Sequence, residues 1–190
     1  MAAHLTERLR EDLLARWSES HRKHHNVAHL HEVLDAIGVL ADDGLCFDRE
    51  TVELAAWFHD AIYDVGRDDN EERSAALART LLGDSPDCDE LARLVLTTKS
   101  HKVDADDING AVLSDADLSV LGASPGRYRD YAEAVRDEYA SVPDDVFKPA
   151  RARVLSALLD GPIFHTPAGR NRWEAQARSN VAAEISELTG

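Results

Sequence analysis

The residues of this sequence most suited to chemistry form a His-Asp doublet inside an apolar stretch. His59 and Asp60 interrupt the run Leu-Ala-Ala-Trp-Phe-His-Asp-Ala-Ile-Tyr at positions 54–63. An ionised carboxylate in apolar surroundings costs several kcal/mol unless a partner compensates its charge. A divalent metal ion can take one ligand from an imidazole and one from an adjacent carboxylate. The doublet therefore predicts a metal site, provided that the rest of the chain supplies more ligands.

Histidines upstream of the doublet are the first source of such ligands. The chain has nine histidines, and five of them fall between His21 and His31. His25 and His29 are four residues apart, so on a helix they would share a face and both could point at one site. The alternative is that this polar segment is a solvated turn.

A second pair of acids interrupts an apolar helical pattern downstream, at positions 111–121. On a helix Asp117 would have Leu113 and Leu121 one turn away on either side, on a strongly apolar face. Asp115 would lie on a less apolar surface. Asp117 is thus the stronger candidate ligand. The alternative is that one of these acids caps a nearby helix or pairs with an arginine.

Together, His25, His59-Asp60 and Asp117 form an ordered H…HD…D set, and here the chain resembles the HD superfamily of metal-dependent phosphohydrolases. The segments 22–29, 57–64, 69–75 and 113–122 look like one bacterial branch, whose members are described as predicted metal-dependent HD phosphohydrolases. Further residues that look like this branch are Tyr128, Tyr131, Arg136, Glu138, Tyr139, Glu174, Arg178 and Asn180. The resemblance covers most of the chain.

This resemblance implies an all-α fold in which helices hold a divalent metal ion: Mn, Fe, Ni, Co, Zn or Mg. Carried over by position, the four ligands would be His25, His59, Asp60 and Asp117. His29 would neighbour the site or help to bind a second ion. His101 falls where multi-metal members of the superfamily often place additional histidines.

Two imidazoles and two carboxylates would leave open positions on the ion for water and a phosphate oxygen, and the ion would lower the pKa of that water. Charge developing on the phosphoryl group needs further cations, and Arg22 is the favoured one, although it could be a solvated surface charge. The candidate general acids are Asp64, one helical turn after the doublet, and Glu71, which could instead cap a helix. Some related hydrolases have Glu three positions after the doublet, where this chain has Tyr63.

The leading functional prediction is a phosphohydrolase acting on a small phosphomonoester or a nucleotide. One alternative is an HD-type oxygenase with two irons, which usually has two extra histidines between the doublet and the last Asp; this chain has only His101 there. Another alternative is a metal-binding or regulatory domain without turnover. Aromatic residues could line a pocket that stacks a base, but at helical spacing they more often belong to the core.

Helical periodicity predicts the elements that must position these residues. The expected helices span about 5–17, 27–40, 48–64, 70–83, 91–99, 111–121, 125–140, 149–159 and 167–188. The expected N-caps are Asp48, Asn70, Asn109 and Ser124, and Gly83 is the expected C′ residue. No period-two strand pattern is present. The sequence predicts one all-α domain of about eight helices over 1–190, with a metal-binding core in roughly 20–125 and the helices of 125–190 packed on it.

Composition limits the classes of partner. A formal net charge of -15 over 190 residues argues against binding a nucleic-acid duplex, which needs a basic face. No apolar run reaches the roughly 20 residues that a membrane span needs. No apolar signal stands at the N-terminus, so a cytoplasmic protein is expected. The expected partner is a small phosphorylated substrate, and the oligomeric state is left open.

Overall fold

The computed structural model describes residues 5–83 and 86–190, and within these ranges every regular element is a helix. The predicted all-α class is therefore confirmed. The elements are α1 (Glu7–Trp17), α2 (Val27–Asp42), α3 (Arg49–Phe58), α4 (Asn70–Leu82), α5 (Pro86–Thr97), α6 (Ile108–Asp117), η1 (Leu118–Gly122), α7 (Pro125–Glu138), α8 (Asp144–Leu159), α9 (Pro167–Gly169), η2 (Arg170–Glu174) and α10 (Ala175–Thr189). Among the described residues, no helix has the length and apolar character to cross a membrane.

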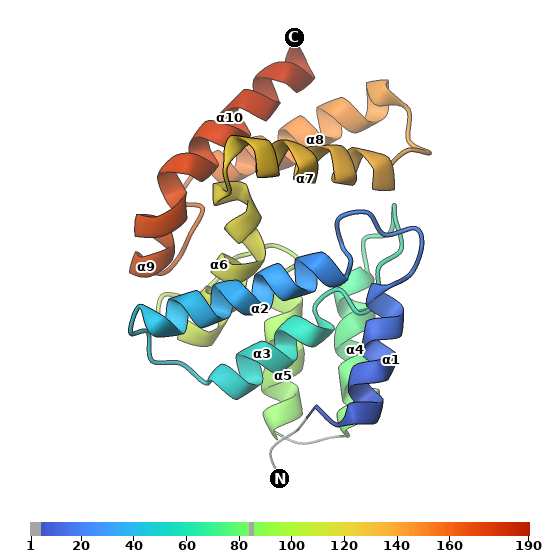
Figure 1. The fold of residues 1–190 in the computed structure, drawn as a ribbon, viewed down its shortest axis with the longest axis vertical. Coiled ribbons are helices and arrows are strands. Elements are labelled where there is room, and N and C mark those ends of the chain that lie inside the picture. Colours follow the sequence, from blue (N-terminus) through green and yellow to red (C-terminus); the bar gives the residue numbers. More distant parts are fainter. Residues whose placement is uncertain (1–4, 84–85) are drawn as a thin grey trace.

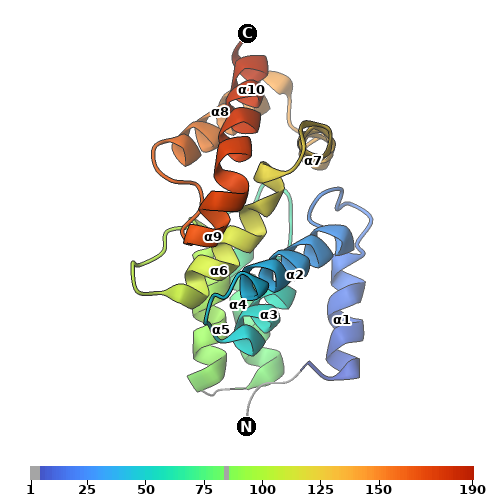
Figure 2. The same ribbon diagram turned by 60° about the vertical axis from the view of Figure 1, so that its left-hand side comes forward.

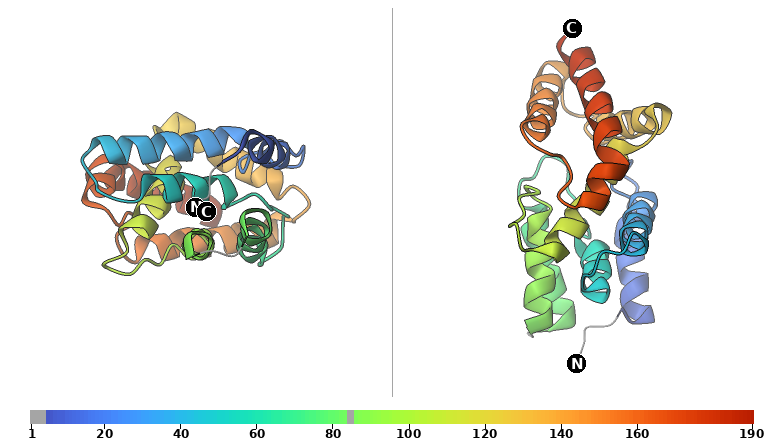
Figure 3. Two further views of the ribbon diagram at one scale, coloured as in Figure 1. Left: turned by 90° about the horizontal axis from the view of Figure 1, so that it is seen from below. Right: turned by 90° about the vertical axis from the view of Figure 1, so that its left-hand side faces the viewer.

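The helices form two groups that α6 and η1 connect (Figures 1 and 2). Helices α1 to α5 pack with α6 around one hydrophobic cluster, and η1, α7, α8 and α10 pack around another. Figure 3 shows the two groups stacked along the long axis of the molecule. Trp173 of η2 packs against both clusters. The first group carries the His59-Asp60 doublet. The second group lies over the start of α2, which is the end of that helix close to the doublet.

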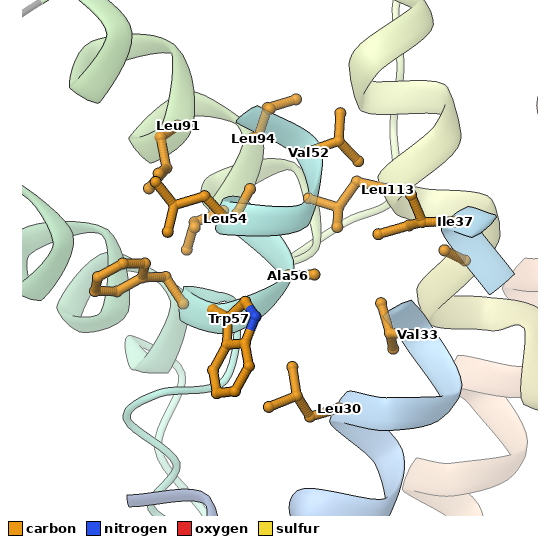
Figure 4. Packing of buried hydrophobic residues seen from close by; sticks show 14 of the residues in the cluster. Leu30, Val33, Ile37, Val52, Leu54, Ala56, Trp57, Leu91, Leu94 and Leu113 are labelled. Atoms are coloured by element: carbon orange, nitrogen blue, oxygen red, sulfur yellow. The ribbon is translucent and has the colours of Figure 1, made fainter. Parts of the chain in front are cut away.

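Helix α3 is the centre of the first group. All its residues from Leu54 to Phe58 are buried, which explains why this run is apolar on every face rather than amphipathic. Figure 4 shows side chains of α2, α5 and α6 around it, among them Leu30, Leu94 and Leu113. The chain reaches His59 directly from this buried helix.

The bounds of several helices differ from those predicted. Helix α5 spans Pro86–Thr97, where the prediction was about 91–99. Helix α3 ends at Phe58, with His59 as its C-cap, so the doublet follows the helix instead of lying within it. Helix α8 starts at Asp144 rather than at Pro149, because two acidic residues in its first turn favour the helix N-terminus. The segment predicted as one helix over 167–188 is helical throughout but is made of α9, η2 and α10 in succession.

The predicted N-caps Asp48 and Ser124 are confirmed, because their side chains accept hydrogen bonds from the backbone of α3 and α7. Gly83 also ends α4 with a φ of 80°, as predicted. The other two predicted caps are wrong. Asp69 precedes α4, and the Asn70 side chain instead bonds the backbone of a nearby loop. Asp107 caps α6, whose residue Asn109 accepts from the backbone N–H of the cap of α3.

Candidate metal centre

Three side chains from three helix ends meet in a cluster that could hold a metal ion: His29, His59 and Asp117. The Nε2 atom of His29 lies 3.0 Å from Oδ1 of Asp117, and Nε2 of His59 lies 3.5 Å from the same oxygen. The two Nε2 atoms are 3.4 Å apart. Both histidines are almost fully buried. We call these three residues the metal cluster.

Local structure explains how each member reaches this point. His29 lies in the first turn of α2 on the buried face that continues through Val33 and Ile37. His59 is the C-cap of α3, and Asp117 is the last residue of α6. Helices α2, α3 and α6 contact one another pairwise in the first group of helices. The cluster thus forms where three helices that share one core bring their ends together.

Asp60 and His101 lie at the edge of the metal cluster. Oδ2 of Asp60 is 3.3 Å from Nε2 of His59 and 4.0 Å from Nε2 of His29. Nε2 of His101 is 3.7 Å from Oδ2 of Asp117. The backbone φ of His101 is 52°, a region that non-glycine residues rarely adopt. Its carbonyl accepts a hydrogen bond from His165 Nε2 at 2.8 Å, which helps to hold this conformation.

Second contacts orient the cluster histidines. The Nδ1–H of His59 donates to the carbonyl of Ala56 at 2.8 Å, which turns Nε2 toward the cluster. The Trp17 ring lies beside both imidazoles, with centroids 5.3 Å from His59 and 6.2 Å from His29. Nδ1 of His29 is the buried side-chain atom without a hydrogen-bond partner among the described residues. His59 is therefore held more firmly than His29.

The pKa values of the residues in and around the metal cluster depend on one another. Burial acts to lower the pKa of His59, but the carboxylates of Asp60 and Asp117 outweigh it and raise this pKa well above its usual value. Burial likewise opposes ionisation of the two acids, yet the histidines lower the pKa of Asp60 to about 2 and that of Asp117 well below its usual value. Burial lowers the pKa of His101. Both carboxylates therefore stay ionised and favour a cation at this point.

The donor set and its spacing fit a divalent ion. Imidazole nitrogens and carboxylate oxygens bind such ions at about 2.0–2.2 Å, which places neighbouring ligand atoms roughly 3–4 Å apart. The separations within the metal cluster, from 3.0 to 3.5 Å, lie in this range. Asp60 would supply a further oxygen after a small side-chain movement.

His25 lies outside the metal cluster, although the family resemblance implied it as one of the four ligands. Its Nδ1–H donates to Oε2 of Glu138 at 2.6 Å, and its ring stacks on Tyr63 with centroids 4.0 Å apart. The reason is the helix start: Asn26 is the N-cap of α2 and has an extended backbone, so His25 precedes the helix and shares no face with His29. In the metal cluster, His29 takes the place that the resemblance implied for His25.

Arg22 also has a different place from the one expected for a phosphate ligand. Its side chain is fully buried, and its guanidinium donates to the carbonyls of His25 and Asp60 at 3.0 and 2.7 Å and to that of Ala61 at 3.3 Å. Glu19 accepts from its Nε. Arg22 therefore ties the segment before α2 to the turn that carries the doublet and has little freedom to meet a substrate.

The two candidate general acids, Asp64 and Glu71, differ in position and in the direction of their pKa shifts. Asp64 is half-exposed and pairs with Arg73 at 2.5 Å, and this hydrogen bond lowers its pKa, so it stays ionised. Glu71 lines the pocket over the metal cluster, and burial raises its pKa. Only Glu71 of this pair therefore has the position and the pKa direction of a proton donor.

Asp115, which the sequence kept as the rival of Asp117, has a structural role. Its buried carboxylate accepts from the backbone N–H groups of His165 and Thr166 at 2.6 and 2.9 Å and from the Thr166 hydroxyl at 2.7 Å. A Cβ at Gly169 would lie 2.3 Å from Oδ2 of Asp115, so only glycine fits there. Asp115 therefore holds the backbone just before α9, whose N-cap is Thr166, instead of capping a helix itself.

A pocket of about 420 Å³ opens above the metal cluster. Its lining combines polar residues of the first helix group, including Asp60, Glu71, His101 and Asp117, with residues of α7 and α8. His25 also lines it. The pocket thus connects the candidate metal ligands to the surface between the two groups of helices.

The sequence contained a signal that separates His29 from His25, which their spacing alone does not. Asn26 is a strong N-cap residue, and a helix that starts after it carries His29 in phase with Val33, Ile37 and Leu40 on the apolar face. Glu138 was noticed only through the family resemblance, since nothing local marks its contact with a segment more than 110 residues away.

Compared with protein-family models, curated proteins and solved structures, the chain has no match in any of the three.

Proposed function

We propose that this protein is a metal-dependent phosphohydrolase that cleaves a small phosphate monoester. The observation that carries the proposal is the convergence of His29, His59 and Asp117, with Asp60 beside them, next to an open pocket that Asp60 and Asp117 line. In chain order these residues retain the H…HD…D pattern of the HD superfamily, with His29 as the first histidine. The mixture of imidazole and carboxylate ligands suits Mn, Fe, Ni, Co, Zn or Mg.

A divalent ion bound by these residues would supply Lewis-acid activation of water and of a phosphoryl oxygen. The protein contributes a rigid donor set, because His59 is fixed by the Ala56 carbonyl and the surrounding core. Asp60 and Asp117 remain ionised and hold the positive charge where the phosphate must approach. The phosphate would therefore bind where Asp60 and Asp117 line the pocket, with the leaving group toward its mouth.

Two residues of the pocket are suited to handle protons and phosphate oxygens. Glu71 can hold a proton on its carboxyl group, because burial raises its pKa, and deliver it to the leaving oxygen. His25 donates through Nδ1 to Glu138, and no described residue hydrogen-bonds its Nε2. Burial opposes a charge on His25, but the Glu138 hydrogen bond raises its pKa, so Nε2–H can donate to a phosphoryl oxygen.

His101 supports a second candidate function, an oxygenase with two irons. Its Nε2 lies 3.7 Å from Oδ2 of Asp117, so it adds a third imidazole next to the metal cluster. The segment between the doublet and Asp117 contains no other histidine. This makes a second complete ligand set harder to assemble, and the hydrolase is the better supported of the two.

The test measures metal content by elemental analysis and phosphate release from p-nitrophenyl phosphate on the same purified samples. We expect His29→Ala and Asp117→Asn to lose both metal and activity. His25→Ala should keep the metal and lose activity. The exposed His31, two residues from His29 on α2, provides the control: His31→Ala should retain both.

Other outcomes would replace the proposal. Metal lost from His25→Ala but kept in His29→Ala would restore His25 as the ligand. Stoichiometric metal with no phosphate release from any phosphomonoester would indicate a metal-binding domain without turnover. Two irons per chain without hydrolysis would favour the oxygenase.

A further inference from the structure

The part of the pocket lining that comes from the second group of helices is largely apolar. Six residues from α7, α8 and the loop between them belong to it, and we call them the apolar wall: Val135, Tyr139, Val142, Val146, Ala150 and Val154. The metal cluster belongs to the first group of helices and the apolar wall to the second. A molecule that fills the pocket therefore touches both ionised ligands and hydrocarbon.

Part of the apolar wall is exposed to solvent instead of being buried in the core. Val146, Ala150 and Val154 are spaced four residues apart and form one stripe on α8. The exposed fractions of Val146 and Val154 are 56% and 59%. Of the five large hydrophobic residues that are exposed in the described part of the chain, only these two line the pocket. Apolar side chains that share a pocket with a candidate metal centre are typical of a ligand-binding surface.

Several of the polar side chains that line the pocket are already bonded to the protein and are not free to recognise a nucleobase or a sugar. The amide of Asn70 uses both its oxygen and its nitrogen on the backbone of Asp64. The Tyr63 hydroxyl donates to Glu138, and the Tyr131 hydroxyl accepts from Arg151. A site that discriminates among polar groups needs free, directed hydrogen-bonding atoms. The pocket is better suited to an apolar organic group.

The charges of the pocket favour a single phosphate over a chain of phosphates. Two arginines line the pocket, and each is already paired: Arg67 with Asp69 at 2.6 Å and Arg151 with Glu184 at 2.9 Å. The carboxylates of the metal centre add negative charge. A diphosphate or triphosphate would bring several negative charges to a pocket whose arginines are already neutralised.

We propose that the substrate is a monoester with one phosphate, which binds at the metal cluster, and an apolar alkyl or aryl group, which packs against Val146, Ala150 and Val154. This inference rests on the proposed phosphohydrolase function and specifies its substrate class. The apolar wall selects among monoesters, while the metal cluster binds the group that all of them share.

The experiment measures binding to the Mn²⁺-loaded protein by calorimetry with three non-hydrolysable probes: methylphosphonate, hexylphosphonate and a nucleoside 5′-methylenephosphonate. Each methylene that is fully buried strengthens binding by about fourfold. Even with partial burial, we expect hexylphosphonate to bind at least roughly tenfold more tightly than methylphosphonate. The nucleoside probe should bind more weakly than hexylphosphonate.

A matched pair of variants separates the apolar wall from general effects. The double variant Val146→Ser and Val154→Ser changes the exposed stripe, and valine and serine have similar helix propensities. Affinity for hexylphosphonate should fall severalfold, while affinity for methylphosphonate stays unchanged. The control, Leu81→Ser and Leu96→Ser, replaces two exposed apolar residues outside the pocket and should alter neither affinity.

The two proposals fail in different ways. If p-nitrophenyl phosphate is hydrolysed but methylphosphonate and hexylphosphonate bind equally, or if the nucleoside probe binds most tightly, the inference about the apolar group is overturned and the phosphohydrolase stands. If no phosphonate binds and no phosphate is released, the phosphohydrolase is overturned, and the substrate class is overturned with it.

Discussion

Replacing Glu138 with glutamine should destabilise the protein by about 3 kcal/mol at neutral pH. The side chain of Glu138 is fully buried and receives five hydrogen bonds. Its Oε1 accepts from the backbone N–H groups of Lys23, His24 and His25 at 2.8, 2.8 and 2.9 Å. Its Oε2 accepts from His25 Nδ1 at 2.6 Å and from the Tyr63 hydroxyl at 3.1 Å. One carboxylate thus anchors the segment before α2 to α7.

The magnitude follows from the pKa of Glu138. Burial alone would raise this pKa, but the hydrogen bond from His25, its charge and the backbone N–H groups lower it from 4.5 to about 2. A fall of about 2.5 corresponds to roughly 3 kcal/mol of folding free energy, at about 1.4 kcal/mol for each pH unit. The histidine side of the same pair is part of this figure and is not added to it.

The sign of the pH dependence is set by a folded-state pKa that lies below the unfolded one. The stabilisation is fully present above pH 4.5 and is lost as the pH falls through 4.5 toward about 2. Glutamine cannot ionise, so Glu138→Gln lacks this contribution at every pH. The difference in stability between wild type and variant should therefore shrink from about 3 kcal/mol at pH 7 to about 2 kcal/mol at pH 3.5.

Urea denaturation followed by tryptophan fluorescence, at pH 7 and at pH 3.5, measures these differences. Metal is removed beforehand, because an ion that binds only the folded state would add its own stabilisation. Glu133→Gln is the control, since Glu133 is exposed on the same helix. A loss below about 1 kcal/mol for Glu138→Gln at pH 7, or a loss that is no smaller at pH 3.5, would refute the reasoning.

Three further predictions concern single positions. Asp115→Ala leaves the backbone N–H groups of His165 and Thr166 without their acceptor and should lower the unfolding free energy by about 2–5 kcal/mol in denaturation, yet elemental analysis should find its metal retained. Gly122→Ala would place a Cβ 2.5 Å from the Cβ of Trp173, and it should lower the unfolding free energy by about 1–3 kcal/mol in the same assay; an unchanged value would show that the two segments can move apart. Glu71→Gln should keep the metal but reduce the rate of p-nitrophenyl phosphate hydrolysis by roughly 10²–10⁴-fold, and a rate within a few-fold of wild type would exclude Glu71 as the proton donor.

Much of the local structure follows from patterns within a few residues. Periodic apolar residues predict the helices, and Asp48 and Ser124 mark two helix starts because a short acceptor side chain before an apolar run satisfies free N–H groups. The His-Asp doublet can also be recognised from the local sequence, since ionisable groups are rare in apolar runs. The apolar face around Asp117 likewise distinguishes it from Asp115, and the structure places Asp117 in the metal cluster.

Tertiary contacts decided the rest of the site. Two histidines at helical spacing look equivalent in the sequence, but Glu138, more than 110 residues away, binds the backbone and the ring of His25, so that His29 takes the position beside Asp117. From the sequence alone, Arg22 could equally have faced solvent. In the structure its guanidinium donates to the carbonyl of Asp60 in the turn that carries the doublet. Local propensity selects where a helix starts, whereas a buried polar group is placed by the distant partner that satisfies it. At this centre both act: the N-cap at Asn26 puts His29 on the buried face of α2, and the distant Glu138 binds His25.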